Sequence, residues 1–124
     1  EKTLALLLTE DALKQSKWRY NFKELENYVG FSILFGSILY SPKEANDIDV
    51  LNLVLNEKSF IKIDKIIIDI QITQNKKIHA INLTEKELKH ELKNKNKAYI
   101  EALKKGVVLF GQENFIKFIK EILK

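Results

Sequence analysis

The chain has 124 residues, enough for one domain with a single hydrophobic core. Its residues are 45% hydrophobic and 31% charged, as in globular proteins, and no apolar run approaches the roughly 20 residues of a membrane-spanning helix. The lack of cysteine excludes disulfide bonds and thiolate metal sites, so a bound metal would need oxygen or imidazole ligands.

The basic residues are almost all lysines. The net charge of +4 comes from 21 basic and 17 acidic residues, and Arg19 is the only arginine. Arginine dominates base reading and bidentate phosphate recognition, so a nucleic-acid reader with a single arginine would be unusual. We therefore do not expect nucleic acid to be the main ligand, and we interpret the lysines as solvated surface charges.

The sequence also bears on location and domain organisation. No basic and then apolar leader opens the chain, which together with the lack of cysteine predicts a cytoplasmic protein. No methionine is present, not even an initiator, so we expect the sequence to be processed or excised from a longer chain. Within the 124 residues we expect a single domain.

The first part of the chain is predicted to be helical. Residues 2–16 carry apolar side chains at helical spacing, which predicts an amphipathic helix. A second helix is predicted to start at Asn21, because Glu24 completes a capping pattern. Val29 would lie on its apolar face, and Gly30 would follow its end, where a positive φ is common.

Four apolar runs have the length and composition of β-strands. The second run is apolar almost throughout, which indicates a central strand covered on both faces. Residues 38–46, after the first run, contain the only proline and are predicted to form a turn or a short helix. The runs span 31–35, 48–55, 78–83 and 107–110.

The segment 60–73 is compatible with two structures. Several isoleucines alternate with polar residues, a strand pattern, but the isoleucines also fall on one helical stripe. We favour a helix, because the chain between the second and third runs has a length suited to a crossover between parallel strands. Thr84 and Glu87 form a capping box that predicts a further helix, and two more are expected before Gly106 and over 113–123. The predicted fold is an α/β domain with a mixed sheet of about four strands and flanking helices.

The chemically informative segment joins the first two strands. Gly36 lets the backbone approach a ligand, and Ser37 with its neighbouring amides can donate hydrogen bonds to phosphate oxygens. Asp47 and Asp49 are two apart on the second strand, so they share one face at roughly 7 Å separation. Such carboxylates bind Mg²⁺ together with phosphate oxygens and water. The competing interpretation is a tight turn and turn-forming aspartates without a ligand.

Residues 35–37 (Phe-Gly-Ser) and 46–50 (Asn-Asp-Ile-Asp-Val) resemble the signature of the nucleotidyltransferase superfamily that includes DNA polymerase beta, and most closely its minimal stand-alone members. That signature is a Gly-Ser pair after an apolar strand, then an Asp-x-Asp pair before another strand. The asparagine before the first aspartate is a mild departure, since serine is more common there. Segments 77–87 and 106–111 also look like the family's third strand with its capped helix and its closing strand, so the resemblance covers roughly 30–124.

The resemblance implies a Mg²⁺-dependent nucleotidyltransferase that uses ATP or another nucleoside triphosphate. Asp47 and Asp49 would be catalytic residues and metal ligands, while Gly36 and Ser37 would bind the nucleotide's outer phosphates. A nucleoside monophosphate, most commonly AMP, would pass to an acceptor hydroxyl. Minimal members often pair with a small helical partner protein and act as its antitoxin, in some cases by nucleotidylating it. Active members usually add a third carboxylate on the next strand, and the matching position here is His79.

The departure at His79 leaves four interpretations open. The residue is structural with a local hydrogen bond, or it replaces the carboxylate as the base, since neutral imidazole accepts a proton. In the third interpretation the site binds nucleotide without transfer and serves as a protein-interaction module. In the fourth the alignment is shifted, or 60–73 is a strand in which Asp69 supplies the carboxylate. Lys43 and Arg19 are candidate triphosphate contacts, although both are more simply read as solvated charges.

Overall fold

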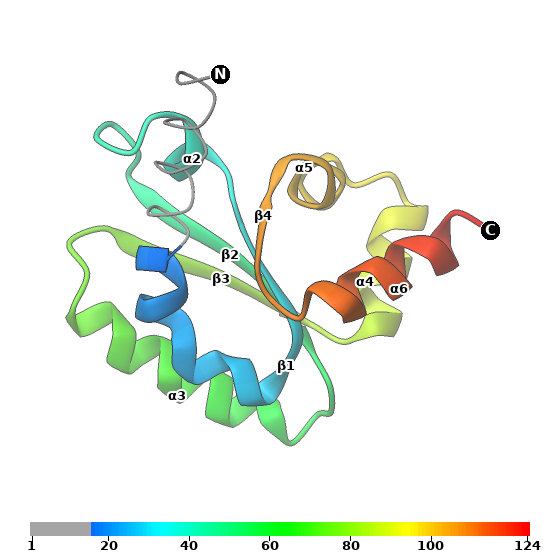
Figure 1. Cartoon of the computed structure of the whole chain (residues 1–124), viewed down its shortest axis with the longest axis horizontal. Helices are drawn as coiled ribbons and strands as arrows, with labels where there is room; N and C mark the ends of the chain where they lie inside the picture. The colour runs from blue at the N-terminus through cyan, green and yellow to red at the C-terminus, as the bar shows by residue number, and fades with distance from the viewer. Residues whose placement is uncertain (1–15) are drawn as a thin grey trace, which may run out of the picture.

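The structure, a computed structural model, describes residues 16–124, and within them four strands form one mixed sheet (Figure 1). The strand order is β3-β2-β1-β4, in which β1 is antiparallel to β2 and β4, whereas β2 and β3 are parallel. This confirms the predicted α/β class and mixed sheet. The strands are β1 (Val29–Phe35), β2 (Asp47–Val54), β3 (Lys77–Leu83) and β4 (Val107–Phe110).

Helices connect the strands and cover the sheet. The segment 60–73 is the helix α3, which joins the parallel strands β2 and β3, so the helical interpretation is confirmed. Residues 2–15 of the first predicted helix lie outside the described residues. Among residues 16–124, no helix is both long and apolar enough to cross a membrane. After helical residues 16–22 come η1 (Lys23–Tyr28), α2 (Ser37–Tyr40), α3 (Ser59–Ile72), α4 (Glu85–Lys93), α5 (Lys97–Lys105) and α6 (Gln112–Ile122).

The second predicted helix has the wrong bounds, although residues 21–28 are helical. The chain is already helical before Asn21, tightens into the 3-10 helix η1, and enters β1 at Val29, which pairs with Val54. Gly30 does not have a positive φ and lies inside the strand, where the register with β2 shifts. A Cβ on it would lie 3.1 Å from the side chain of Leu53, so this glycine permits close packing within the sheet rather than a helix end.

Each face of the sheet has its own layer of helices. On one face, α3 and the segment leading into β1 pack through Phe22, Leu25 and Ile63, all fully buried. On the other face, α4, α5 and α6 pack on β1, β2 and β3, with the fully buried Phe31 and Leu88 in that cluster. The central strand β2 therefore contacts apolar side chains on both faces, as its sequence predicted.

A row of polar side chains crosses the sheet beneath α3. Asn52 accepts a hydrogen bond from the hydroxyl of Ser32 and donates one to Asn82 at 2.9 Å. Asn82 in turn donates to Asp64 of α3 at 3.2 Å. Since Ser32, Asn52 and Asn82 are direct neighbours in the strand register, a slip of either strand pair would leave buried polar groups unpaired. The row therefore specifies the register of β1, β2 and β3.

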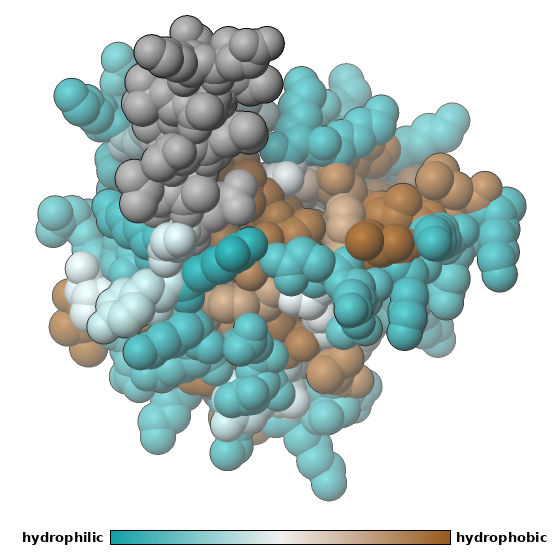
Figure 2. Space-filling view, in the orientation of Figure 1, coloured by the Kyte–Doolittle hydropathy of each residue, from teal (hydrophilic) through white to brown (hydrophobic). Residues whose placement is uncertain are grey.

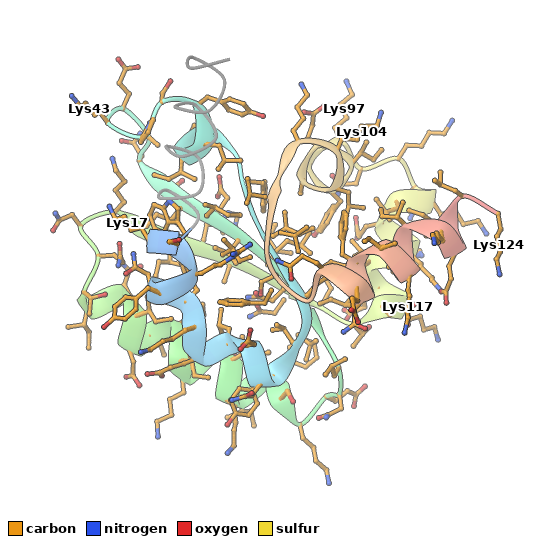
Figure 3. The ribbon with its side chains drawn as sticks, viewed as in Figure 1. Lys17, Lys43, Lys97, Lys104, Lys117 and Lys124 are labelled. Atoms are coloured by element: carbon orange, nitrogen blue, oxygen red, sulfur yellow. The ribbon has the colours of Figure 1, made fainter. Side chains whose placement is uncertain are left out.

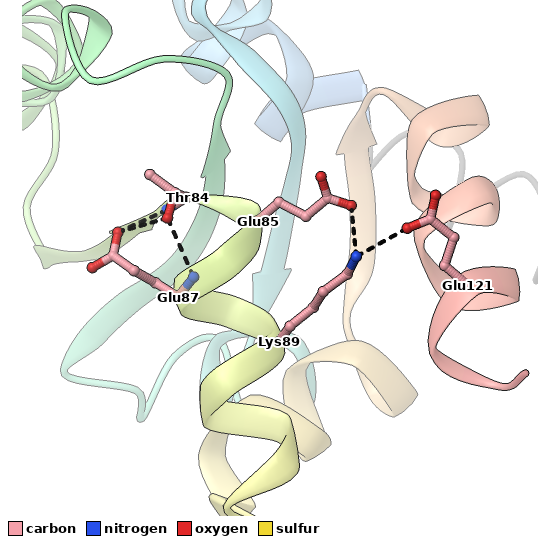
Figure 4. A network of polar contacts seen from close by, with 5 residues as sticks. All are labelled: Thr84, Glu85, Glu87, Lys89 and Glu121. Atoms are coloured by element: carbon pink, nitrogen blue, oxygen red, sulfur yellow. Dashed lines mark hydrogen bonds and ion pairs between the residues drawn. The ribbon is translucent and has the colours of Figure 1, made fainter.

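Polar contacts also fix the position of α4 (Figure 4). The hydroxyl of Thr84 accepts a hydrogen bond from the backbone N–H of Glu87, whose carboxylate accepts from the N–H of Thr84, so the predicted capping box is confirmed. Lys89 bridges Glu85 on its own helix and Glu121 on α6. The hydrogen bond to Glu121 raises the pKa of Lys89, and the same contact lowers the pKa of Glu121. Because these side chains are solvent-exposed, they orient the helices more than they stabilise the fold.

Candidate functional site

The ends of three strands meet at one edge of the sheet. There β1 ends at Phe35, while β2 and β3 begin, because β1 runs antiparallel to β2 and β2 runs parallel to β3. In the register of the sheet, Phe35 is opposite Asp49, and Asp49 is opposite His79. Residues far apart in the sequence are thus direct neighbours at this edge.

The two aspartates lie on the same face of β2, as predicted. They are separated by Ile48, whose side chain is buried in the cluster under α3, so both carboxylates point to the opposite face. Further along β2, that opposite face carries Leu51, which packs in the cluster under α4, α5 and α6. Asp47 is exposed and Asp49 is half-buried. The pair therefore lies where the helical layer has ended and the sheet is open to solvent.

Gly36 holds the turn after β1 against the aspartate pair. Its φ of +83° and ψ of −162° form a backbone conformation that is essentially restricted to glycine. A Cβ at this position would lie 2.4 Å from Oδ2 of Asp49. The backbone therefore approaches the carboxylate more closely than any other residue would allow. Ser37 follows as the exposed first residue of α2.

His79 lies beside Asp49, as the alignment predicted. Its Nδ1 is 3.1 Å from Oδ1 of Asp49, with 62% of the histidine side chain and 21% of the aspartate side chain exposed. Since the carboxylate accepts the Nδ1 proton, the neutral ring has its free electron pair on Nε2. Within residues 16–124, Nε2 takes part in no hydrogen bond. The ring is thus anchored at one nitrogen and open at the other.

Two residues that the sequence did not single out hold this edge together. The side chain of Gln71, at the end of α3, accepts from the backbone N–H of Ile78 at 2.7 Å and donates to the carbonyl of Lys76 at 2.9 Å. The ammonium of Lys76 donates to the carbonyl of Ala45, just before β2. These contacts fix the start of β3 relative to the start of β2. A glutamine at a helix end and one lysine among many give no signal in the sequence, because their role depends on the fold.

The remaining candidates do not join the site. Asp69 is exposed on α3, which covers the opposite face of the sheet, so the interpretation that it supplies the third carboxylate is wrong. Lys43 lies in the loop between α2 and β2, with its side chain directed into solvent (Figure 3). Arg19 is exposed on the helical segment 16–22. None of the three makes a hydrogen bond or ion pair with Asp47 or Asp49 in the described part of the chain.

The donor set at the edge limits what kind of metal site is available. Among the described residues, no group of three or more His, Asp and Glu side chains is placed to hold a metal ion. The pair Asp47 and Asp49 offers carboxylate oxygens on one face, which suits Mg²⁺ when a ligand's phosphate oxygens and water complete its octahedral shell. The residues thus fit a Mg²⁺ ion that arrives with a phosphorylated ligand, rather than a closed protein cage.

Comparisons with known proteins add no family assignment. No protein-family model, no curated protein and no solved structure matches this chain.

Proposed function

We propose that the chain binds a nucleoside triphosphate with Mg²⁺ at this edge and transfers its nucleoside monophosphate, most simply AMP from ATP, to an acceptor hydroxyl. The observation that carries the proposal is the close approach of Gly36 to Asp49, because a turn that only glycine can form lies against one carboxylate of the pair. A purely structural turn has no need of two carboxylates beside it, because like charges on one strand face repel. The resemblance of residues 30–124 to minimal nucleotidyltransferases supports the same function.

The roles of the side chains follow from their positions. Asp47 and Asp49 would bind Mg²⁺, which supplies charge neutralisation on the triphosphate when it is bound. Ser37 and the amides of the turn would donate hydrogen bonds to the outer phosphates. Gly36 keeps this turn close enough to the carboxylates for one triphosphate to contact both.

His79 would act as the base. The acceptor oxygen forms a bond to the α-phosphorus as the bond from that phosphorus to the bridging oxygen breaks, and pyrophosphate leaves. The acceptor's hydroxyl proton passes to Nε2 of His79, the exposed nitrogen, while Asp49 holds Nδ1 and thereby the orientation of the ring.

A second candidate function is nucleotide binding without transfer, as a regulated protein-interaction module. The observation that favours it is the same histidine, because His79 occupies the position where active family members usually have a carboxylate. For the enzyme we propose an acceptor on another molecule, such as the small helical partner protein with which minimal members of the resembled family often pair. The pair would then be a toxin and its antitoxin in the cytoplasm.

The test is transfer from ATP labelled on the α-phosphate, with Mg²⁺ and the proteins that co-purify with the chain. We expect weak transfer by the natural sequence and a gain for His79→Asp, which restores a third carboxylate. Loss in His79→Ala would assign the base to the imidazole, whereas an unchanged low rate would favour the binding module. His90→Ala on α4 is the matched control, because the side-chain hydrogen bond of that ring within the described residues is with Asn94, away from the site. Strong transfer that is indifferent to both changes at His79 would contradict the placement of this residue in the site.

A further inference from the structure

A concave surface lies away from the strand edge, between α4, α5 and α6. It is a groove of about 690 Å³, and none of the five residues of the nucleotide site lines it. Its apolar lining includes Leu92 from α4, Leu103 from α5 and Ile119 from α6. Figure 2 shows hydrophobic side chains gathered over α5 and α6 and bordered by hydrophilic ones. An apolar groove of this size with a polar border is typical of a binding site.

The charged side chains of the groove all have the same sign. Lys89, Lys93 and Lys104 line it, and no acidic residue does. Lys89 is already paired with Glu85 and Glu121, just outside the groove. Lys93 belongs to α4 and Lys104 to α5, and within residues 16–124 neither forms an ion pair. The groove is therefore complementary to an anionic ligand, and two copies of it facing each other would repel.

The apolar lining of the groove stays exposed at the end of α6. Ile122 and Leu123 line the groove, yet 37% and 78% of their surfaces are exposed. A small ligand that fills only part of the groove would leave these side chains in water, whereas a longer amphipathic element would cover them. Helices bind in this way, with an apolar face in a hydrophobic groove and charged side chains at its border.

We propose that the groove between α4, α5 and α6 binds an acidic amphipathic helix of a partner protein. The apolar face of that helix contacts Leu92, Leu103 and Ile119, and carboxylates on its flanks pair with Lys93 and Lys104. The helix binds independently of nucleotide, because the groove shares no residue with the edge that carries Asp49. The proposal therefore does not depend on transfer activity.

Fluorescence anisotropy with designed peptides tests the proposal on the full chain. The probe is a fluorescein-labelled amphipathic helical peptide of about 18 residues, with leucines on one face and glutamates on its flanks. Two further peptides have lysine in place of each glutamate, or the same composition in scrambled order. We expect the acidic amphipathic peptide to bind at least about tenfold more tightly than either, and more weakly as NaCl rises from about 0.05 to about 0.5 M.

Two variants locate the binding. Lys93→Glu with Lys104→Glu changes exposed side chains only, and we expect it to invert the preference so that the basic peptide binds more tightly. Leu123→Gln, also at an exposed position, should weaken the acidic peptide about fivefold or more by removing an apolar contact. Lys43→Glu with Lys117→Glu is the control of equal net charge outside the groove, and binding should stay within about twofold (Figure 3).

Three outcomes would overturn the proposal. Equal binding of the acidic and basic peptides would show that charge does not select the ligand. An unchanged preference in the variant of Lys93 and Lys104 would place the peptide elsewhere. Binding of oleate, measured by displacement of a fluorescent fatty acid, without binding of the acidic peptide would assign the groove to a lipid instead.

Discussion

Replacement of Gly36 by alanine tests the geometry on which the nucleotide site depends. The φ of +83° with ψ of −162° is strained for any residue with a Cβ, at a cost of about 1–3 kcal/mol. The new Cβ would also meet Oδ2 of Asp49 at 2.4 Å. That carboxylate can rotate away, and at most it loses its hydrogen bond to His79, which is worth about 1 kcal/mol.

These contributions combine to a measurable loss of stability. Alanine also restricts the unfolded chain, which returns about 0.4–1 kcal/mol. The net decrease in the free energy of unfolding is therefore about 1–3 kcal/mol for Gly36→Ala. In an Asp49→Ala background the carboxylate contact is absent, so the same change should cost about 1 kcal/mol less. The difference between the two backgrounds measures how tightly Gly36 and Asp49 are packed.

Urea unfolding followed by tryptophan fluorescence measures both values. The only tryptophan is Trp18, which stacks on the fully buried Phe22 and so reports on the core. The matched control is Gly30→Ala, since this glycine has no positive φ. Its Cβ would approach the movable ends of Leu53 and Leu55 at 3.1 and 3.2 Å, and the backbone carbonyl of Leu53 at an ordinary contact distance of 3.7 Å. We expect the control to change stability by less than about 1 kcal/mol. If Gly36→Ala unfolded at the same urea concentration as the control, the described turn and its contact with Asp49 would be wrong.

The remaining predictions concern residues outside the nucleotide site that stabilise the sheet and its helices. Gly111→Ala should destabilise more than Gly36→Ala in the same urea assay, because its Cβ would lie 1.9 Å from the fixed backbone carbonyl of Gly30, and equal costs would contradict this. Asn52→Ala should lower the free energy of unfolding by about 2–4 kcal/mol, since buried Ser32 loses its partner; a cost near zero would show that the polar row is dispensable. Thr84→Ala removes the cap of α4 and should cost about 1 kcal/mol, whereas Thr84→Ser should cost less. Lys89→Met should return the lowered pKa of Glu121 toward its ordinary value in an NMR titration; the contact's small contribution to stability is present at neutral pH and lost as pH falls through that lowered pKa.

Much of the fold follows from local patterns in the sequence. The strands are short apolar runs bounded by turn residues, and the capping box at Thr84 acts within one turn of helix, so local sequence specifies them. The segment 60–73 could be assigned only because a crossover between parallel strands needs a helix-length connection. Asp47 and Asp49 share a face by the two-residue period of any strand, whatever surrounds them.

The errors and omissions have a tertiary origin. Val29 and Gly30 resemble a helix end locally, but pairing with β2 and the register shift beside Gly30 make them part of a strand. The contact of His79 with Asp49 follows from their register in parallel strands, which the resemblance suggested and no spacing rule predicts. Gln71 acts at the site edge only because α3 returns it beside β3. The groove between α4, α5 and α6 likewise depends on how the three helices pack.

Isothermal titration of the chain with ATP, in the presence and absence of Mg²⁺, tests the central claim most directly. We expect binding that requires Mg²⁺ and that is lost in Asp47→Asn with Asp49→Asn, while Gly30→Ala binds like the natural sequence. Unchanged Trp18 fluorescence in the double variant would confirm that its fold is intact. Binding of ATP that persists without Mg²⁺ or survives the loss of both carboxylates would place the nucleotide elsewhere and contradict the proposed site.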